Sequence, residues 1–278
     1  MIGLTTVIPR EPLAPHVAMI WDCNMKAQAF GLERILPKAG ASLIINLAED
    51  ETRSYRNDGQ WRRQFRSGSV LVGPGTRHFV IDTAEQCNVI GVEFQPGGAG
   101  RFFRESLDRL KDADTDLGDL APCATRQLRE RLLEANSAHH RIDVLTAWLL
   151  DRLHDAPLPP VVVHALEWLQ RTPRMQSVAA IAAYTGLSVR RISALFTENI
   201  GVGPKRFLRL QRFGDVIACA HSRRNINWST VAVDCGYHDQ SHLVHEFREF
   251  SGLAPSAWLT SVGAYARHVP IDAILPAD

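Results

Sequence analysis

The chain has 278 residues, which is enough for one large hydrophobic core or two ordinary ones, and two is the better expectation. Its 45% hydrophobic and 22% charged residues are ordinary for a soluble globular protein. No apolar run approaches the ~20 residues that a membrane-spanning helix needs, and the first ten residues lack the pattern of a secretion signal. These features exclude a membrane protein and predict a cytoplasmic one.

The formal net charge of +1 hides a difference between the two halves of the chain. Residues 1–157 contain 19 Lys and Arg against 21 Asp and Glu, whereas residues 160–260 contain 11 against 7. An excess of four positive charges is modest for a nucleic-acid binder, so charge alone decides little. It does indicate which half would face the phosphates of a nucleic acid.

Before residue 100 the sequence has the pattern of short strands. Apolar runs rich in Val and Ile alternate with turns such as Gly73-Pro74-Gly75 and Pro96-Gly97-Gly98. The expected strands are Ser42–Leu47, Ser69–Val72, His78–Asp82 and Asn88–Phe94. They predict an antiparallel sandwich or small barrel, followed by a helix over Ala99–Leu107.

Helical periodicity then dominates. Leucines and isoleucines recur every three or four residues from Leu128 to Leu153, and again over Val161–Arg171. The segment from Asp155 to Pro160 contains three prolines, which cannot lie inside a helix and favour a stiff connector. The expected fold is α+β, with a first domain over 1–155, a linker over 156–160, an all-α domain over 161–260 and a tail over 261–278.

The strongest signal is a repeat within the all-α domain. One copy runs from Ser177 to Ser188 around Gly186, and the other from Trp228 to Asp239 around Gly236. Each copy has an alanine four positions before its glycine. Each is also followed by G-x-x-P, and the second copy has one extra residue between its glycine and its last residue.

The chemistry of these positions predicts two helices that cross at a short turn. A small side chain allows the helices to approach closely, and glycine takes the positive φ of the turn without a steric penalty. Ser188 and Asp239 are placed to cap the following helices by accepting hydrogen bonds from their free N–H groups. Two such units, with Gly186 and Gly236 at their turns, predict a double helix-turn-helix DNA reader. A single copy would be common in helical proteins.

The segment between the copies, Lys205–His221, reads as a helical spacer. At ~1.5 Å per residue, its length is roughly 25 Å. Such a spacer could hold two recognition helices about one turn of DNA apart, ~34 Å, so that both enter the major groove on one side of the duplex.

With its "LSVRRISALF", "GVGPKRFLRLQR" and "CGYHDQSHLVHEFREFSGLAP" motifs, the segment from about Val161 to Leu259 resembles the DNA-binding domain of the AraC/XylS family of bacterial regulators. The resemblance implies a sequence-specific regulator that binds double-stranded promoter or operator DNA, with RNA polymerase as a further partner if it activates. It also implies that the base-contacting residues are Arg190, Ser193, Ala194, Gln240, Ser241 and His245.

Two of these positions depart from the family, because Ala194 and His245 stand where arginine is frequent. Alanine can touch only a thymine methyl group, and histidine offers one hydrogen bond rather than a bidentate one. We therefore expect Arg190 and Gln240 to carry the base specificity, with the first unit contributing more. For each, the alternative is an ordinary surface or capping role. The residues expected to contact phosphates are Arg191, Lys205, Arg206, Arg209 and Arg224, whereas Arg212 is a candidate for an internal salt bridge.

The N-terminal half, with "ILPKAGASLIINLAED", "SGSVLVGPGTRHFVI" and "GVEFQPGGAGRFF", resembles the cupin-like sensory domains often fused to this DNA-binding domain. The catalytic cupin pattern needs a His-x-His motif and a following Glu, and the region has only the isolated His78. We therefore expect no metal and no cofactor. Arg77 and His78 are candidates for a small-molecule pocket, with an ordinary place at the end of a loop as the alternative. The helices from Leu128 to Leu153 are expected to form a homodimer contact or to pack on the barrel.

Other function classes find little support. The five cysteines are scattered and nowhere form C-x-x-C, and the cluster His238, His242 and His245 has incidental spacing. An enzyme, such as a cupin-type catalyst or a DNA-repair methyltransferase, would need a metal triad or a cysteine in a basic context, so we expect none. A ligand-independent DNA binder, with a first domain that only dimerises, stays open as an alternative.

Overall fold

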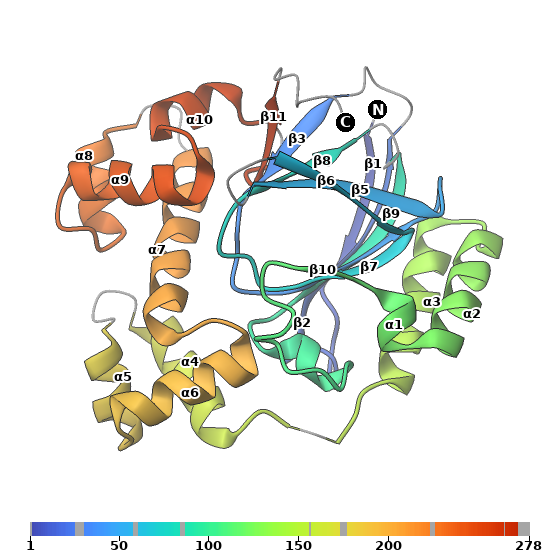
Figure 1. Ribbon diagram of the computed structural model, residues 1–278, viewed down its shortest axis with the longest axis horizontal. Helices are drawn as coiled ribbons and strands as arrows, with labels where there is room; N and C mark the ends of the chain where they lie inside the picture. The colour runs from blue at the N-terminus through green and yellow to red at the C-terminus, as the bar shows by residue number, and fades with distance from the viewer. Residues whose placement is uncertain are drawn as a thin grey trace.

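The computed structural model describes residues 2–25, 31–57, 61–83, 87–155, 157–172, 177–222, 226–263 and 265–271. An N-terminal body of antiparallel strands lies beside a C-terminal body of helices (Figure 1). The predicted α+β class, with a strand-rich first half and an all-α second half, is confirmed. In the described part of the chain, no helix is both long and apolar enough to cross a membrane.

The strands form two sheets that face each other. The first ten strands are β1 (Ile2–Val7), β2 (Val17–Met25), β3 (Leu32–Ile35), β4 (Ser42–Asn46), β5 (Glu51–Asn57), β6 (Trp61–Ser67), β7 (Ser69–Val72), β8 (Phe79–Asp82), β9 (Asn88–Phe94) and β10 (Asp114–Asp116). Within the described residues, one sheet has the order β1-β2-β9-β4-β7-β10. The other has the order β11-β3-β8-β5-β6, in which β11 is His268–Ile271. The four strands expected from the sequence correspond to β4, β7, β8 and β9.

The larger sheet is held by an apolar core on its outer face. β4 and β9 pair antiparallel at its centre, with Ile45 opposite Ile90. Both side chains are completely buried, and they share a core with Leu145 and Leu149 of the helix α3 (Ala138–Asp151). Strands rich in Val and Ile form here because their branched side chains pack well on a pleated surface covered by helices.

The helices α1 (Leu117–Leu120), α2 (Pro122–Glu134) and α3 (Ala138–Asp151) lie at the outer side of the strand body (Figure 1). Their apolar side chains belong to the same core that covers the larger sheet. An ion pair between Arg141 and Asp22, with N–O distances of 2.5 and 2.9 Å, also connects α3 to β2. Of the two expectations for these helices, packing on the barrel is therefore the one observed. Leu133 and Leu150 stay exposed.

The prediction of a helix over Ala99–Leu107 is wrong. Only one 3₁₀ turn forms, over Gly98–Arg101, and bends and turns follow it. Three glycines lie in or beside this turn, and glycine costs a helix about 1 kcal/mol per residue relative to alanine. Phe102, Phe103 and Leu107 are nevertheless buried, so the irregular segment still contributes to the barrel core.

The helical body is built from α4 (Pro160–Arg171), α5 (Val178–Thr185), α6 (Val189–Ile200), α7 (Pro204–His221), α8 (Trp228–Asp234), α9 (Gln240–Ser251) and α10 (Pro255–Ser261). Its own core contains Phe213, Phe247, Phe250 and Trp258, all fully or almost fully buried. Pro160 is the first residue of α4, a position where proline's missing N–H removes no helical bond.

The tail expected over 261–278 contains an additional strand. β11 (His268–Ile271) pairs antiparallel with β3 and becomes the edge of the five-stranded sheet. The backbone N–H of Leu36 donates to Arg267 O, and the Arg267 guanidinium donates to Pro37 O at 2.7 Å. The end of the described chain therefore returns to the barrel and holds the helical body against it. Residues 272–278 lie outside the described residues.

Candidate nucleic-acid interface

The first helix-turn-helix unit is formed by α5 and α6. α5 ends at Gly186, whose φ of 68° places it in the left-handed region, as expected from the repeat. The Ser188 side chain then accepts a hydrogen bond from the backbone N–H of Arg191 at 3.2 Å and caps α6. Ile192 and Phe196 are fully buried on one face of α6, so the opposite face points outward.

The second unit, α8 and α9, is built in the same way. Gly236 has a φ of 76°, and the Asp239 side chain caps α9 by accepting from the backbone N–H of His242 at 2.7 Å. This backbone hydrogen bond is the main cause that holds the pKa of Asp239 below its usual value. Leu243 and Phe247 bury the inner face of α9. The turns and caps expected at Gly186, Ser188, Gly236 and Asp239 are thus all present.

The two units are joined by the single uninterrupted helix α7. Gly201 and Gly252, the first residues of the two G-x-x-P sequences, end α6 and α9 with φ of 86° and 70°. Pro204 and Pro255 begin α7 and α10. α7 spans 18 residues and buries Phe213 and Val216 between the units, so it is a stiff spacer.

The residues expected to read bases lie on the outward faces of α6 and α9. Arg190, Ala194, Gln240, Ser241 and His245 are exposed, and Ser193 is half-buried. Gln240 is not free to rotate, because its side-chain oxygen accepts a hydrogen bond from the Ser229 hydroxyl at 2.8 Å. The structure thus brings each predicted set onto one helix face, and base contact itself stays a prediction.

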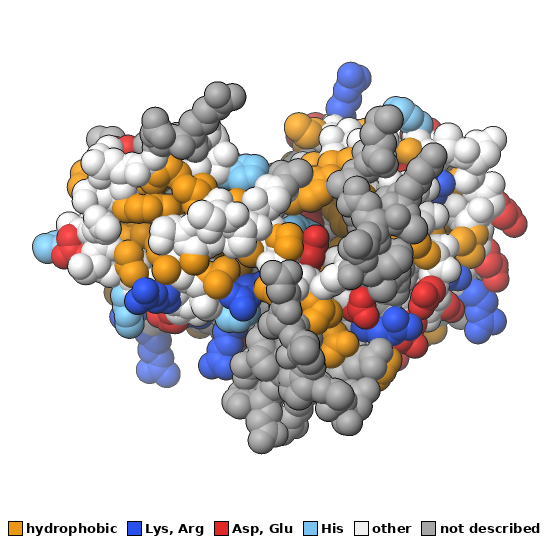
Figure 2. Space-filling view, turned by 90° about the horizontal axis from the view of Figure 1, so that it is seen from above, with side chains coloured by type: hydrophobic (Ala, Val, Ile, Leu, Met, Phe, Trp, Pro, Cys, Tyr) orange, Lys and Arg blue, Asp and Glu red, His pale blue; other side chains and the backbone are white. Residues whose placement is uncertain are grey.

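The expected phosphate-contacting residues fall into three groups. Arg191 and Lys205 are exposed. Several Lys and Arg side chains project along one edge of the helical body in Figure 2. Arg224 lies outside the described residues. Arg206 and Arg209 are placed differently from the expectation, because both are engaged in ion pairs with acidic residues of α9. Arg212 pairs with Glu246 at 3.4 Å, as expected for an internal salt bridge.

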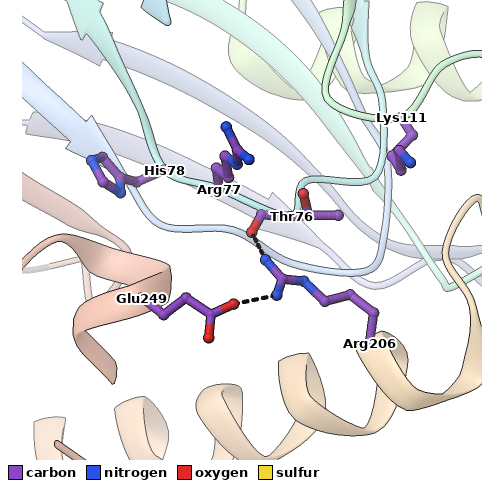
Figure 3. A pocket seen from close by; sticks show the side chains of 6 residues that line it. All are labelled: Thr76, Arg77, His78, Lys111, Arg206 and Glu249. Carbon is purple, nitrogen blue, oxygen red and sulfur yellow. Dashed lines mark hydrogen bonds and ion pairs between the residues drawn. The ribbon is translucent and has the colours of Figure 1, made fainter. Parts of the chain in front are cut away.

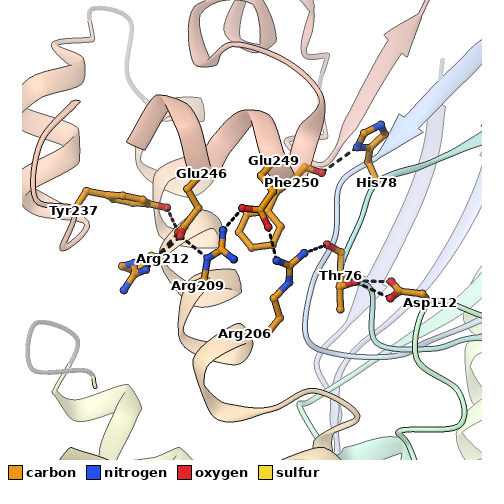
Figure 4. Close-up of polar contacts among 10 residues, drawn as sticks. All are labelled: Thr76, His78, Asp112, Arg206, Arg209, Arg212, Tyr237, Glu246, Glu249 and Phe250. Atoms are coloured by element: carbon orange, nitrogen blue, oxygen red, sulfur yellow. Dashed lines mark hydrogen bonds and ion pairs between the residues drawn. The ribbon is translucent and has the colours of Figure 1, made fainter. Parts of the chain in front are cut away.

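The ion pairs form a network along the side of α9 that faces α7 and the barrel (Figure 4). Arg206 donates to Glu249 at 2.5 Å, and Arg209 donates to Glu246 at 2.6 Å and also to Glu249. The Tyr237 hydroxyl donates to Glu246 at 2.9 Å. These arginines lower the pKa of Glu249 to about 2, and burial together with Glu246 raises the pKa of Tyr237.

Sequence reasoning missed this network, although a signal for it exists. Arg206, Arg209 and Arg212 recur at intervals of three residues, as do Glu246 and Glu249, so each set follows one side of its helix. Two complementary rows on helices that share a core are expected to pair. Arg206 and Arg209 already have carboxylate partners, and DNA phosphate contact by these two residues stays a prediction.

Two barrel side chains hold the C-terminal end of α9. His78 contacts Phe250 O through Nδ1 at 3.1 Å, and Arg34 donates to Ser251 O at 2.9 Å. A carbonyl can only accept, so Nδ1 of His78 carries the hydrogen, and burial and Arg34 lower the pKa of this imidazole. The last carbonyls of a helix lack partners within it, and here the barrel supplies them.

A pocket of about 510 Å³ lies at the same junction (Figure 3). It is lined by Thr76, Arg77, His78, Lys111, Arg206 and Glu249. Arg77 and His78 therefore do line a pocket, but between the two bodies of the molecule rather than inside the barrel. Among the residues that the structure describes, no cluster of three or more His, Cys, Asp or Glu is placed to hold a metal.

Comparison with known proteins divides the chain into the same halves. A model of a helix-turn-helix domain matches residues 181–261, and a model of a domain of unknown function (DUF6597) matches residues 5–116. No curated protein matches the chain. The C-terminal region therefore carries an AraC-type helix-turn-helix domain.

Several solved structures are similar in arrangement. Apo ToxT from Vibrio cholerae is 12% identical, with 87% of this chain and 96% of that chain covered and a TM-score of 0.46. ToxT from the same organism with a bound unsaturated fatty acid is 13% identical, with 86% and 93% covered and a TM-score of 0.44. The DNA-binding domain of AdpA in complex with a target DNA is 24% identical, with 36% and 90% covered and a TM-score of 0.34.

Proposed function

We propose that this chain, whose C-terminal region carries an AraC-type helix-turn-helix domain, is a transcription regulator that binds DNA in a sequence-specific manner under the control of its barrel half. One observation carries the proposal. Two capped recognition helices, α6 and α9, present polar outward faces and are joined by the stiff helix α7. Both units lie in one helical body, and the 18-residue helix between them rises about 27 Å, somewhat less than the ~34 Å between successive turns of the major groove.

Base reading is assigned mainly to Arg190. Its side chain is exposed, and a guanidinium donates two parallel hydrogen bonds to guanine. Gln240 suits adenine, but its oxygen is already engaged by Ser229, which leaves its amide nitrogen as the freer group. Ser193, Ala194, Ser241 and His245 then supply short contacts around these two residues.

Phosphate binding is assigned to Arg191, Lys205 and Arg224, together with the N–H groups at the starts of the helices. Arg191 and Lys205 are exposed, and no acidic partner is found for either among the described residues. Such contacts position the protein without reading sequence.

Lys205→Gln should therefore weaken binding to all sequences alike and reduce the dependence of binding on salt concentration. Arg131→Gln on α2 is the control.

Selection of bound sequences from a random DNA pool tests the proposal. The expected outcome is two short sequence elements about 10 base pairs apart, centre to centre, because the two recognition helices enter successive major grooves. A pool that stays random after several rounds, at low and at moderate salt, would contradict sequence-specific binding.

We further propose that the chain forms a homodimer through the outer surfaces of α2 and α3. The apolar faces of these helices are used inside the chain, but Leu133 and Leu150 remain about half exposed, with relative exposures of 50% and 43%. Light scattering coupled to gel filtration should give twice the chain mass, and Leu133→Glu should return it to the single mass. A mass equal to one chain at all concentrations would reject the dimer.

A further inference from the structure

The pocket between the barrel and the helical body has walls from both. Thr76, Arg77 and His78 come from the loop before β8, and Lys111 comes from the turn before β10. Arg206 on α7 and Glu249 on α9 form the opposite wall (Figure 3). We name this cavity the seam pocket.

The seam pocket is lined only by polar and charged side chains. Arg77, Lys111 and Arg206 bring three positive charges, and Glu249 brings one negative charge. Arg77 and Lys111 are exposed, whereas Arg206 is held between Glu249 and Thr76 O, each at 2.5 Å. The lining therefore has an excess of positive charge that the residues of the pocket do not balance.

The rigidity of the two walls favours a bound molecule over a solvated surface. Asp112 accepts hydrogen bonds from the backbone N–H of Thr76 at 2.5 Å and from its hydroxyl at 2.6 Å, which fixes the loop that carries Arg77. Arg206 also lies over the Phe250 ring, 4.5 Å from its centre. Of the three cations, Arg206 is the one held by its partners, so it would lose less side-chain entropy on binding an anion than the exposed Arg77 and Lys111.

We propose that the seam pocket binds a small organic anion with two or more phosphate or carboxylate groups, which bridges Arg77 and Lys111 of the barrel to Arg206 of α7. The inference rests on the proposed function, since it names the class of effector that the barrel half responds to. A volume of about 510 Å³ is that of a metabolite-sized ligand.

The chemistry of the lining residues favours a small anion over two other classes of ligand, fatty acids and the phosphates of DNA. A fatty acid needs an apolar wall for its chain, and the seam pocket has none among its lining residues. A DNA phosphate would have to reach Arg206 between the two bodies, where the guanidinium donates to Thr76 O at 2.5 Å.

Binding at this site would change the link between the two bodies. An anion that pairs with Arg206 competes with Glu249, which keeps Arg209 as its partner. The bridging anion adds ion pairs from the barrel to α7, so it stabilises the docked arrangement of the second unit over any other. A ligand that binds one arrangement better shifts the population toward it.

Calorimetric titration of the full chain with inorganic pyrophosphate and, separately, with citrate tests the proposal, with ionic strength held constant by NaCl. The two arms distinguish phosphate from carboxylate ligands, and oleate is a third probe. We expect saturable binding of at least one of the first two anions and a higher melting temperature in its presence. Arg77→Gln combined with Lys111→Gln should weaken this binding about tenfold or more. Both residues are exposed, so the variant should fold, and Arg131→Gln on α2 is the matched control.

Three results would overturn the inference. The first is no saturable binding of either anion, or tight binding of oleate alone. The second is equal affinity in the double variant. The third is a loss of DNA binding by the double variant without any anion, as large as that of Lys205→Gln, which would assign these cations to DNA. A gel-shift assay on the same samples separates the two proposals, because intact DNA binding without anion binding rejects only the seam pocket.

Discussion

The two helix-turn-helix units can be compared residue by residue by counting from their caps, Ser188 and Asp239. Seven residues after the cap, the first unit has the apolar Leu195 and the second has Glu246, and both are buried. Ten residues after it, both have a glutamate. Glu198 in the first unit is exposed, whereas Glu249 in the second is paired with Arg206 and Arg209.

On the outward faces of the recognition helices, it is the first unit that carries the more strongly charged side chain. Two residues after the cap the first unit has Arg190 and the second Ser241, and six residues after it they have Ala194 and His245. Only the first unit therefore presents an arginine at these two positions.

The two recognition helices also differ in how many contacts their C-terminal ends make with the barrel. The end of α6 receives one side-chain hydrogen bond from the barrel half, from the Ser106 hydroxyl to Glu198 O at 3.2 Å. The end of α9 receives bonds from both His78 and Arg34 and is braced by the arginines of α7. The second unit is thus held more firmly by the rest of the molecule, whereas the first has the exposed Arg190, to which we propose to assign most of the base reading.

Glu246→Ala should give the largest effect, because it removes the charge at the centre of the second unit's network. The glutamate is only 2% exposed, and its loss removes the partner of Arg212 and of the Tyr237 hydroxyl and leaves Arg209 with Glu249 alone. We expect the free energy of unfolding to fall by about 3–5 kcal/mol. Urea denaturation followed by circular dichroism measures it.

Glu198→Ala removes a glutamate from the first unit and is the control, with an expected change within about 0.5 kcal/mol for an exposed side chain. Equal destabilisation by the two variants would contradict the conclusion that only the second unit depends on a buried glutamate.

Arg267→Met tests the return of the chain to the barrel. The guanidinium donates to Pro37 O at 2.7 Å, and burial lowers its pKa to about 10. The substitution leaves a carbonyl without its donor, so we expect a loss of about 1–3 kcal/mol. Hydrogen exchange should become faster in β11 and at the end of α9, and stay unchanged in α6. Faster exchange in α6 alone would show that the strand does not hold the second unit.

A smaller effect is expected from pH. The pKa of Glu249 is lowered from 4.5 to about 2 in the folded chain, so its ion pairs stabilise the fold above the unfolded value. This contribution should disappear as the pH falls from about 4.5 toward 2. Its side chain is 38% exposed, so solvent screening limits the effect to about 1 kcal/mol. Glu249→Gln should flatten this part of the stability profile, and an unchanged profile would reject the assignment.

How far the sequence predicted the structure depends on how local each feature is. The turns at Gly186 and Gly236 and the caps Ser188 and Asp239 follow from a few adjacent residues, so they could be predicted. Strands β4, β7, β8 and β9 could be predicted for the same reason, since each is a continuous apolar run between turn residues.

Features that depend on distant residues could not be predicted in this way. Pairing of β11 with β3 joins residues more than 200 positions apart, and no local pattern indicates it. The ion pairs of Arg206 and Arg209 belong here too, because the matching spacing of the arginines on α7 and the glutamates on α9 predicts pairing only once the two helices are known to be neighbours. The seam pocket has the same origin, since its two walls come from different halves of the chain.

The most direct test of the account compares Arg190→Ala with Ser241→Ala, the two positions two residues after the caps, on the best sequence selected from the random pool. For Arg190→Ala we expect a loss of about 1–3 kcal/mol in binding free energy and a relaxed preference at one base. We expect a loss below about 1.5 kcal/mol for Ser241→Ala, the upper range for one ordinary hydrogen bond. A larger loss for Ser241→Ala, or no loss for Arg190→Ala, would contradict the assignment of base reading mainly to Arg190.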